Sequence, residues 1–159
     1  MSENELHVHI GEVKTGKEGD VLHALVGSCI AIGFLHKKRN ICGLAHCLLS
    51  KSTSDKFEIG GRYVDQAIYS LLTLMEIPPE DVRNIRAIVA GGGNMTMPSN
   101  ASRKKLVGST NADFARKTLR ERRIRITHED LGGLNARKVI IDCSSNDFTV
   151  KDIPRLGAA

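Results

Sequence analysis

Aromatic side chains are scarce in this sequence. Its 159 residues include no tryptophan, and aromatic residues make up only 4% of the chain. The net charge is +5, and much of the basic excess lies in Arg120, Arg122, Arg123 and Arg125. Nucleic-acid sites usually combine such charge with stacking aromatics or a reading motif. Neither is present, so we expect no nucleic-acid binding. We interpret the run as a solvated helix end or, alternatively, as a contact for an acidic protein partner.

Long apolar runs are also missing. No run approaches the roughly 20 residues that span a bilayer. The first five residues, MSENE, are polar and acidic, unlike the start of a secretory signal. We therefore expect a cytoplasmic protein without direct membrane insertion. The length suits a single domain, 1–159, with a core of Ile, Leu, Val and Ala.

Cysteine pairs with the CxxC spacing of zinc sites are absent. The four cysteines are Cys29, Cys42, Cys47 and Cys143. In a cytosolic chain of this size we expect them to be reduced thiols. Strand alternation over 41–47 would turn Cys42 and His46 to one face and Cys47 to the other. We therefore expect no metal site.

One cysteine has the surroundings of a nucleophile. Cys29 follows Gly27 and Ser28 in a predicted turn, and His46 lies on a later apolar segment. A neighbouring imidazole can take the thiol proton and hold the thiolate as an ion pair, which is reactive toward acyl carbons. We expect Gly27 to supply a backbone geometry closed to other residues. The amides of Gly27 and Ser28 are then candidates for stabilising an oxyanion.

The spacing of apolar residues predicts mainly strands with two helices. Alternating or apolar runs predict strands at 6–10, 21–26, 30–35, 41–49, 84–90, 124–128, 137–142 and 148–150. Helical spacing predicts helices at 63–75 and 111–122, the second capped by Ser109 or Thr110. The glycines at 91–93 lack the pattern of a phosphate-binding loop and predict a tight turn with close backbone approach. This order predicts an α+β fold, in which a hairpin would bring Cys29 near His46.

Six stretches, taken in order, resemble one protein family. They are VGSCIAI at 26–32, GLAHCLL at 43–49, RYVDQA at 62–67, AGGGNM at 90–95, VGSTN at 107–111 and DLGGLNAR at 130–137. In these stretches, from about His9 to about Asp142, the chain is similar to the chemoreceptor glutamine deamidases, the CheD family of bacterial chemotaxis. No single motif is decisive, but six in the same order are specific.

The resemblance implies a fold, a reaction and partners. The fold is one of stacked mixed β-sheets flanked by helices, a cysteine-hydrolase fold resembling the cytotoxic necrotizing factor toxins. In the reaction, the thiolate of Cys29 attacks the side-chain amide carbon of a protein glutamine. His46 accepts the thiol proton and later protonates the departing ammonia, and water hydrolyses the thioester without metal or organic cofactor. The implied partners are the cytoplasmic helices of chemoreceptors and a CheC-type phosphatase.

At His23 the chain departs from the family. The resemblance places there, six residues before Cys29, a threonine that orients the histidine. Either the ring of His23 or its backbone carbonyl could take over this task, so we keep His23 with Cys29 and His46 as candidate catalytic residues. We interpret Arg137 and Asp130 as holding the closing turn in shape rather than binding substrate.

Three functions are compatible with these residues. The first is a protein-glutamine glutaminase that acts on chemoreceptors. The second is a binding module that docks to receptors and to a CheC-type phosphatase, with weak or no activity because of His23. The third is an unrelated cysteine hydrolase of small amides. A receptor fragment separates the first from the others, because only a deamidase converts its glutamines to glutamate.

Overall fold

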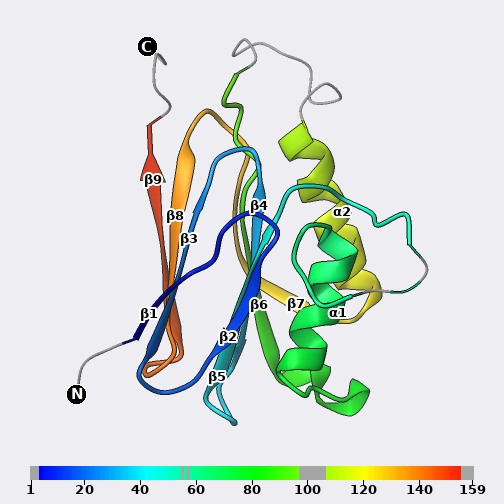
Figure 1. The fold of residues 1–159 in the computed structure, drawn as a ribbon, viewed down its shortest axis with the longest axis vertical. Helices are drawn as coiled ribbons and strands as arrows, with labels where there is room; N and C mark the ends of the chain where they lie inside the picture. Colours follow the sequence, from blue (N-terminus) through cyan, green and yellow to red (C-terminus); the bar gives the residue numbers. More distant parts are fainter. Residues whose placement is uncertain (1–3, 55, 57, 97–106, 155–159) are drawn as a thin grey trace.

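Two β-sheets dominate the computed structural model, which describes residues 4–54, 56, 58–96 and 107–154 (Figure 1). The four-stranded sheet has the order β1-β3-β8-β9, formed by Asn4–His7, Asp20–Val26, Ala136–Asp142 and Asp147–Ile153. The five-stranded sheet has the order β2-β5-β4-β6-β7, formed by Val13–Gly16, Ile41–Cys47, Ile30–His36, Ile85–Gly91 and Arg125–Leu131. Both sheets are mixed, because β1 runs parallel to β3 and β6 runs parallel to β7.

Helices cover one face of the five-stranded sheet. They are α1 (Val64–Leu74), the 3-10 helix η1 (Pro79–Asn84) and α2 (Val107–Glu121). In Figure 1 the four-stranded sheet lies at the left, the five-stranded sheet in the middle and the two α-helices at the right. The predicted α+β class with stacked mixed sheets is confirmed. No helix in the described ranges is long and apolar enough to cross a membrane.

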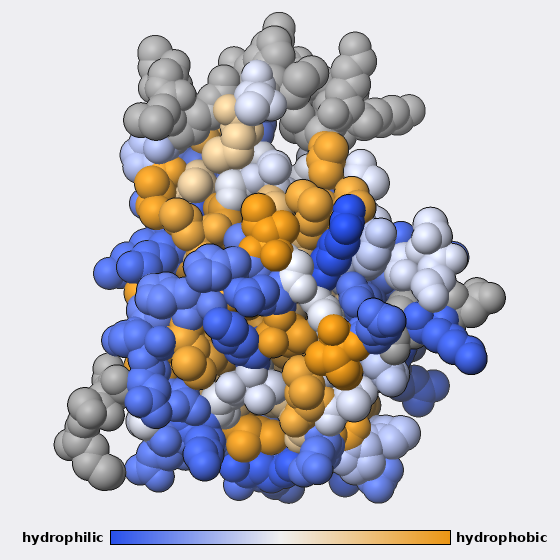
Figure 2. Space-filling view, viewed as in Figure 1, coloured by the Kyte–Doolittle hydropathy of each residue, from blue (hydrophilic) through white to orange (hydrophobic). Residues whose placement is uncertain are grey.

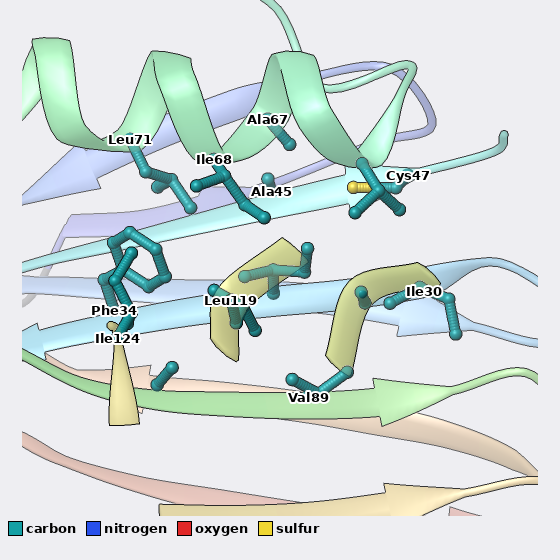
Figure 3. Close-up of a cluster of buried hydrophobic side chains, with 14 of the residues drawn as sticks. Ile30, Phe34, Ala45, Cys47, Ala67, Ile68, Leu71, Val89, Leu119 and Ile124 are labelled. Atoms are coloured by element: carbon teal, nitrogen blue, oxygen red, sulfur yellow. The ribbon is translucent and has the colours of Figure 1, made fainter. Parts of the chain in front are cut away.

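The central strand β4 is buried on both faces. All seven of its residues are buried, which fits an almost wholly apolar strand enclosed between two layers. Ile30 and Phe34 face the helices, where they belong to a core cluster with Leu71 of α1 (Figure 3). Ala31 and Leu35 belong to a second cluster, between the two sheets. The core thus fixes both faces of the strand that begins directly after Cys29.

The predicted hairpin is confirmed by the pairing of β4 with β5. The second helix, however, begins at Val107 rather than at residue 111, so Ser109 and Thr110 lie inside its first turn and neither caps it. Small residues let this turn approach its neighbour closely, since a Cβ on Gly108 would lie 2.5 Å from the Cα of Gly92. The loop predicted at 99–105 lies outside the described residues.

The sequence pattern does not predict β2 or η1. Both are short and largely polar or proline-initiated, so neither shows a clear period. The strand predicted at 6–10 ends at His7, and the segment that follows turns toward β5. The turn predicted at 130–136 spans only residues 132–135, between β7 and β8, and it carries the chain from one sheet to the other.

We expect Phe34→Ala to lower the free energy of unfolding by about 3–5 kcal/mol, because removing a buried ring leaves a cavity between β4 and the helices. Urea unfolding followed by circular dichroism measures the change. As a control, Ile153→Ala alters a partly exposed residue at the end of edge strand β9 and should change stability by no more than about 0.5 kcal/mol. Equal losses in the two variants would contradict the placement of Phe34 in the core.

Candidate active site

Cys29 lies in a turn that crosses from one sheet to the other. This turn, at residues 27–29, connects the end of β3 in the four-stranded sheet with the start of β4 in the five-stranded sheet. The backbone of the glycines at 91–93 makes hydrogen bonds to this turn. Gly92 donates its N–H to the carbonyl of Cys29 and Gly93 donates to the carbonyl of Gly27, each at 2.9 Å. The backbone around the thiol is therefore fixed by hydrogen bonds.

Gly91 makes this approach possible. Its φ is +114°, and a Cβ at this position would lie 2.1 Å from the carbonyl oxygen of Cys29. Both the left-handed backbone and the lack of space require glycine. The prediction of a tight turn with close backbone approach at 91–93 is confirmed.

Gly27 serves a different purpose from the one predicted. It does not have a positive φ, so the expectation of a backbone geometry closed to other residues is wrong. The constraint is steric, because a Cβ here would lie 2.9 Å from Cγ of Met95. Among the described residues, the amide N–H groups of Gly27 and Ser28 have no backbone or side-chain acceptor, which leaves them available as donors.

His46 lies on β5, next to the strand that follows Cys29. In the β4–β5 pair His46 lies opposite Ala31. Ala31 and Cys29 both belong to the core cluster between the two sheets, whereas Cys47 belongs to the cluster under the helices. Cys29 directly precedes Ile30, the first residue of β4 that pairs with β5. The hairpin thus joins the strand that follows the predicted nucleophile to the strand that carries the predicted base.

The main chain of residues 8–12 holds His46 in place. Its Nδ1 lies 3.1 Å from the carbonyl oxygen of Val8. Its backbone N–H donates to the carbonyl of Glu12 at 3.0 Å, and its own carbonyl accepts from Gly11 at 2.9 Å. Because a carbonyl oxygen only accepts, Nδ1 carries the proton in this bond and a neutral ring has its free lone pair on Nε2. Nε2 is therefore the nitrogen that can act as a base.

Burial favours the neutral forms of both groups. Cys29 and His46 are 7% and 4% exposed. Desolvation raises the pKa of the Cys29 thiol and lowers the pKa of the His46 imidazole. The resting pair is consequently a thiol and a neutral imidazole, in contrast to the predicted thiolate–imidazolium ion pair. The thiolate then has to form by proton transfer during the reaction.

Among the described residues, the ring of His23 makes no hydrogen bond to His46. Its Nε2 pairs with the carboxylate of Glu5, and its ring stacks on His7 with centroids 4.9 Å apart. The connection to His46 runs through the backbone, since the carbonyl of His23 accepts the N–H of Val8 at 2.7 Å. The ring of His23 nevertheless lines a pocket of about 570 Å³ together with His46. Of the two routes considered from the sequence, the geometry favours the backbone.

The other three cysteines lack the features of a nucleophile. Cys42, Cys47 and Cys143 are fully buried and reduced. Burial raises the pKa of Cys47, and the neighbouring thiol of Cys143 raises that of Cys42. Among the described residues, no three His, Cys, Asp or Glu side chains form a group that could hold a metal ion.

Arg137 ties the closing turn to the same glycines. Its guanidinium donates to the carbonyls of Gly91 and Asn135 at 3.3 and 2.9 Å and pairs with Asp130 at 3.2 Å. These contacts agree with a structural role for Arg137 and Asp130. The sequence analysis missed Val8 and Glu12, which act through backbone atoms and therefore leave no signal in residue type.

Comparisons with known proteins place the chain among chemotaxis proteins. The family model "CheD chemotactic sensory transduction" matches residues 48–152. Similar proteins include a "Probable chemoreceptor glutamine deamidase CheD 2" of Ruegeria sp. (strain TM1040). It is 47% identical, and the alignment covers 97% of this chain and 95% of the relative. "Probable chemoreceptor glutamine deamidase CheD" proteins of Bdellovibrio bacteriovorus and Methanococcus maripaludis are 35% and 33% identical. Those alignments cover 95% and 92% of this chain, and 96% and 94% of the relatives.

If His46 accepts the thiol proton, its removal should change how the alkylation rate of Cys29 depends on pH. In the unchanged protein, neutral His46 should sustain alkylation by iodoacetamide down to below pH ~6.5, because its lowered pKa keeps the ring unprotonated. In His46→Ala the rate should rise only at pH values above the ordinary cysteine pKa of about 8.5, because burial raises the pKa of the Cys29 thiol. Peptide-resolved mass spectrometry distinguishes Cys29 from the other thiols. His128→Ala, which removes an exposed histidine on β7, is the control, and superimposable profiles for His46→Ala and unchanged protein would show that the pair is not coupled.

Proposed function

Because this chain belongs to the CheD family, we propose that it is a chemoreceptor glutamine deamidase, a protein-glutamine glutaminase that acts in chemotaxis. The observation that carries the proposal is the pairing of β4, which begins directly after Cys29, with β5, which carries His46 with Nε2 left as the basic nitrogen. Nucleophile and general base are the two groups that amide hydrolysis through a thioester requires. The names of the relatives indicate the same reaction.

The proposed reaction begins with a proton transfer. His46 takes the proton of the Cys29 thiol while Sγ attacks the side-chain amide carbon of the glutamine. Available N–H groups at Gly27 and Ser28 would stabilise the negative charge on the amide oxygen. His46 then gives its proton to the nitrogen, the C–N bond breaks, and ammonia leaves a thioester on Cys29.

Hydrolysis completes the cycle. His46 is neutral again and accepts a proton from water as the oxygen attacks the thioester carbon. The C–S bond breaks, the sulfur regains its proton from His46, and the product is glutamate. Because burial lowers the pKa of His46, the ring is unprotonated at neutral pH and free to accept a proton at the start of each step.

We assign His46 a positioning partner in the main chain. The carbonyl of Val8 holds Nδ1, and the carbonyl of His23 in turn holds the N–H of Val8. Because this two-step connection uses the backbone of residue 23, a histidine could replace the family's threonine there and His46 would still be held in place. His23 is thus a positioning residue that acts through its backbone.

The wider setting follows from the family. The proposed substrate is the cytoplasmic helical region of chemoreceptors, and the proposed location is the cytoplasm. A CheC-type phosphatase would be a second partner, and the whole chain, 1–159, would act as one cysteine-hydrolase domain of the kind found in the cytotoxic necrotizing factor toxins. A binding module without activity is the second candidate, favoured by the raised pKa of Cys29 and by the histidine at position 23.

Replacing the nucleophile should abolish the reaction and leave the fold intact. We expect Cys29→Ala to convert no glutamine of a receptor cytoplasmic fragment to glutamate, as measured by mass spectrometry of the fragment. Cys143→Ala, which removes a buried thiol away from the site, is the matched control and should retain activity. Full activity of Cys29→Ala would contradict the mechanism. An unchanged protein that binds the fragment without converting it would favour the binding module.

The backbone route predicts a small effect at position 23. His23→Ala should lower the deamidation rate by less than about tenfold, whereas His46→Ala should lose the roughly 10²–10⁴-fold that a general base contributes. Rates on the receptor fragment measure both. A loss in His23→Ala as large as in His46→Ala, restored by His23→Thr, would instead show that the side chain at 23 orients the base.

A further inference from the structure

Large hydrophobic side chains are exposed near the candidate site. Seven are exposed among the described residues: Ile10, Leu25, Leu49, Ile59, Leu74, Val107 and Ile153. Four of these line two pockets: Ile10 and Leu25 line one together with His46, and Leu49 and Val107 line the other. We call these four residues the apolar rim. Exposed apolar groups that gather around a reactive group, rather than scatter, mark interaction sites.

The first pocket lies beside the base. Ile10 and Leu25 are 58% and 61% exposed and line a pocket of about 570 Å³ together with His46. Leu25 is on β3 two residues before Gly27, and Ile10 precedes Gly11, whose N–H holds the carbonyl of His46. Both side chains are therefore attached to backbone that positions the active site.

The second pocket lies on the helix side of Cys29. Leu49 and Val107 line a pocket of about 480 Å³, and Val107 is 56% exposed. This pocket is linked to the thiol through Gly92, which donates to the carbonyl of Cys29 and packs against Gly108, the neighbour of Val107. One pocket thus contains His46, and the other is connected to the backbone of Cys29 through Gly92.

We propose that the apolar rim is the docking surface for the substrate polypeptide and binds apolar side chains that flank the target glutamine on the same face of a receptor helix. The inference rests on the proposed function, because a protein substrate must bring its neighbouring residues against the enzyme when its glutamine reaches Cys29. A helix that lays an apolar face on such a surface is a recurrent mode of peptide recognition.

Charge agrees with this occupant. The residues that line the two pockets include His7, His9, His23 and Lys51 and no carboxylate. Glu5 and Glu12 lie beside this lining, but each is paired with one of its histidines, His23 and His9. The cation among the lining residues that has no such carboxylate partner is Lys51, which favours a segment that carries acidic side chains. In Figure 2, hydrophobic side chains are visible between hydrophilic ones in the upper, middle and lower parts of this face.

The chain offers a matched control at the opposite end. Leu74 is 41% exposed and lines a pocket near the β4–β5 turn, where Arg39 donates to the carbonyl of Glu76. β4 runs from Cys29 at one end to this turn at the other (Figure 1). Leu74→Gln therefore removes an exposed hydrophobic side chain without touching the rim.

The test compares Leu25→Thr, Ile10→Thr and Leu49→Thr with Leu74→Gln. For each variant, kcat/KM is measured on a receptor cytoplasmic fragment, and the alkylation rate of Cys29 reports the thiol alone. Affinity for the fragment is measured separately by calorimetry in the Cys29→Ala background, where no turnover occurs. We expect each rim variant to lower kcat/KM at least about tenfold, through a higher KM, since contacts in apolar pockets contribute roughly 10–200-fold.

The outcomes separate the two proposals. Weaker binding and higher KM in the rim variants, with alkylation rates close to that of Leu74→Gln, support the rim. The rim is overturned if its variants bind and convert the fragment as well as Leu74→Gln. It is also overturned if their alkylation rates fall by as much as their kcat/KM, because the effect would then lie on the thiol. If the unchanged protein converts no glutamine but the Cys29→Ala chain binds and the rim variants weaken binding, the deamidase proposal fails and the rim stands. If the Cys29→Ala chain does not bind the fragment at all, the rim is overturned.

Discussion

The route of the chain between the two sheets at residues 27–29 is the constraint on which the site depends. β3 ends in one sheet and β4 begins in the other, so Cys29 lies where the layers meet. The backbone of Gly91–93 closes on this turn, and no side chain larger than hydrogen fits at Gly91. Because β4 is buried on both faces and paired along both edges, the core of the molecule sets the position of Cys29 relative to β5. The thiol is therefore positioned by the scaffold rather than by a surface loop.

His46, too, is positioned by backbone atoms rather than by other side chains. Three backbone contacts, to Val8, Gly11 and Glu12, fix its main chain and its Nδ1. Burial then keeps both reactive groups uncharged at rest, so charge develops only as the proton moves from sulfur to Nε2. In a partly desolvated site such charge is stabilised best by fixed dipoles, and the N–H groups of the Cys29 turn are the nearest candidates. On this account the site depends on proton transfer and orientation, and a standing ion pair is not required.

Much of this arrangement could be predicted from the sequence, and the remainder shows what residue types do not encode. Long apolar runs predicted β4 and β5, and strand alternation correctly separated Cys47 from the face of His46. β2 could not be predicted because four partly polar residues carry no period, and the close approach of Gly108 in α2 to Gly92 joins segments that are distant in the sequence. The partner of His46 was missed because any residue at position 8 would offer the same carbonyl. Gly27 was misinterpreted because a sequence does not reveal why a position requires glycine. The reason can be a positive φ or, as here, the space that a neighbouring side chain, Met95, occupies.

The central claim is that a receptor glutamine passes through a thioester on Cys29, and trapping that intermediate tests it most directly. The protein is mixed with a receptor cytoplasmic fragment, quenched in acid within the first turnover and digested for mass spectrometry. The account predicts an adduct on the peptide that contains Cys29, with the mass of the glutamine-containing segment less ammonia, which decays as glutamate appears. Glutamate formation without any adduct on Cys29, or with the adduct on another cysteine, would contradict the account.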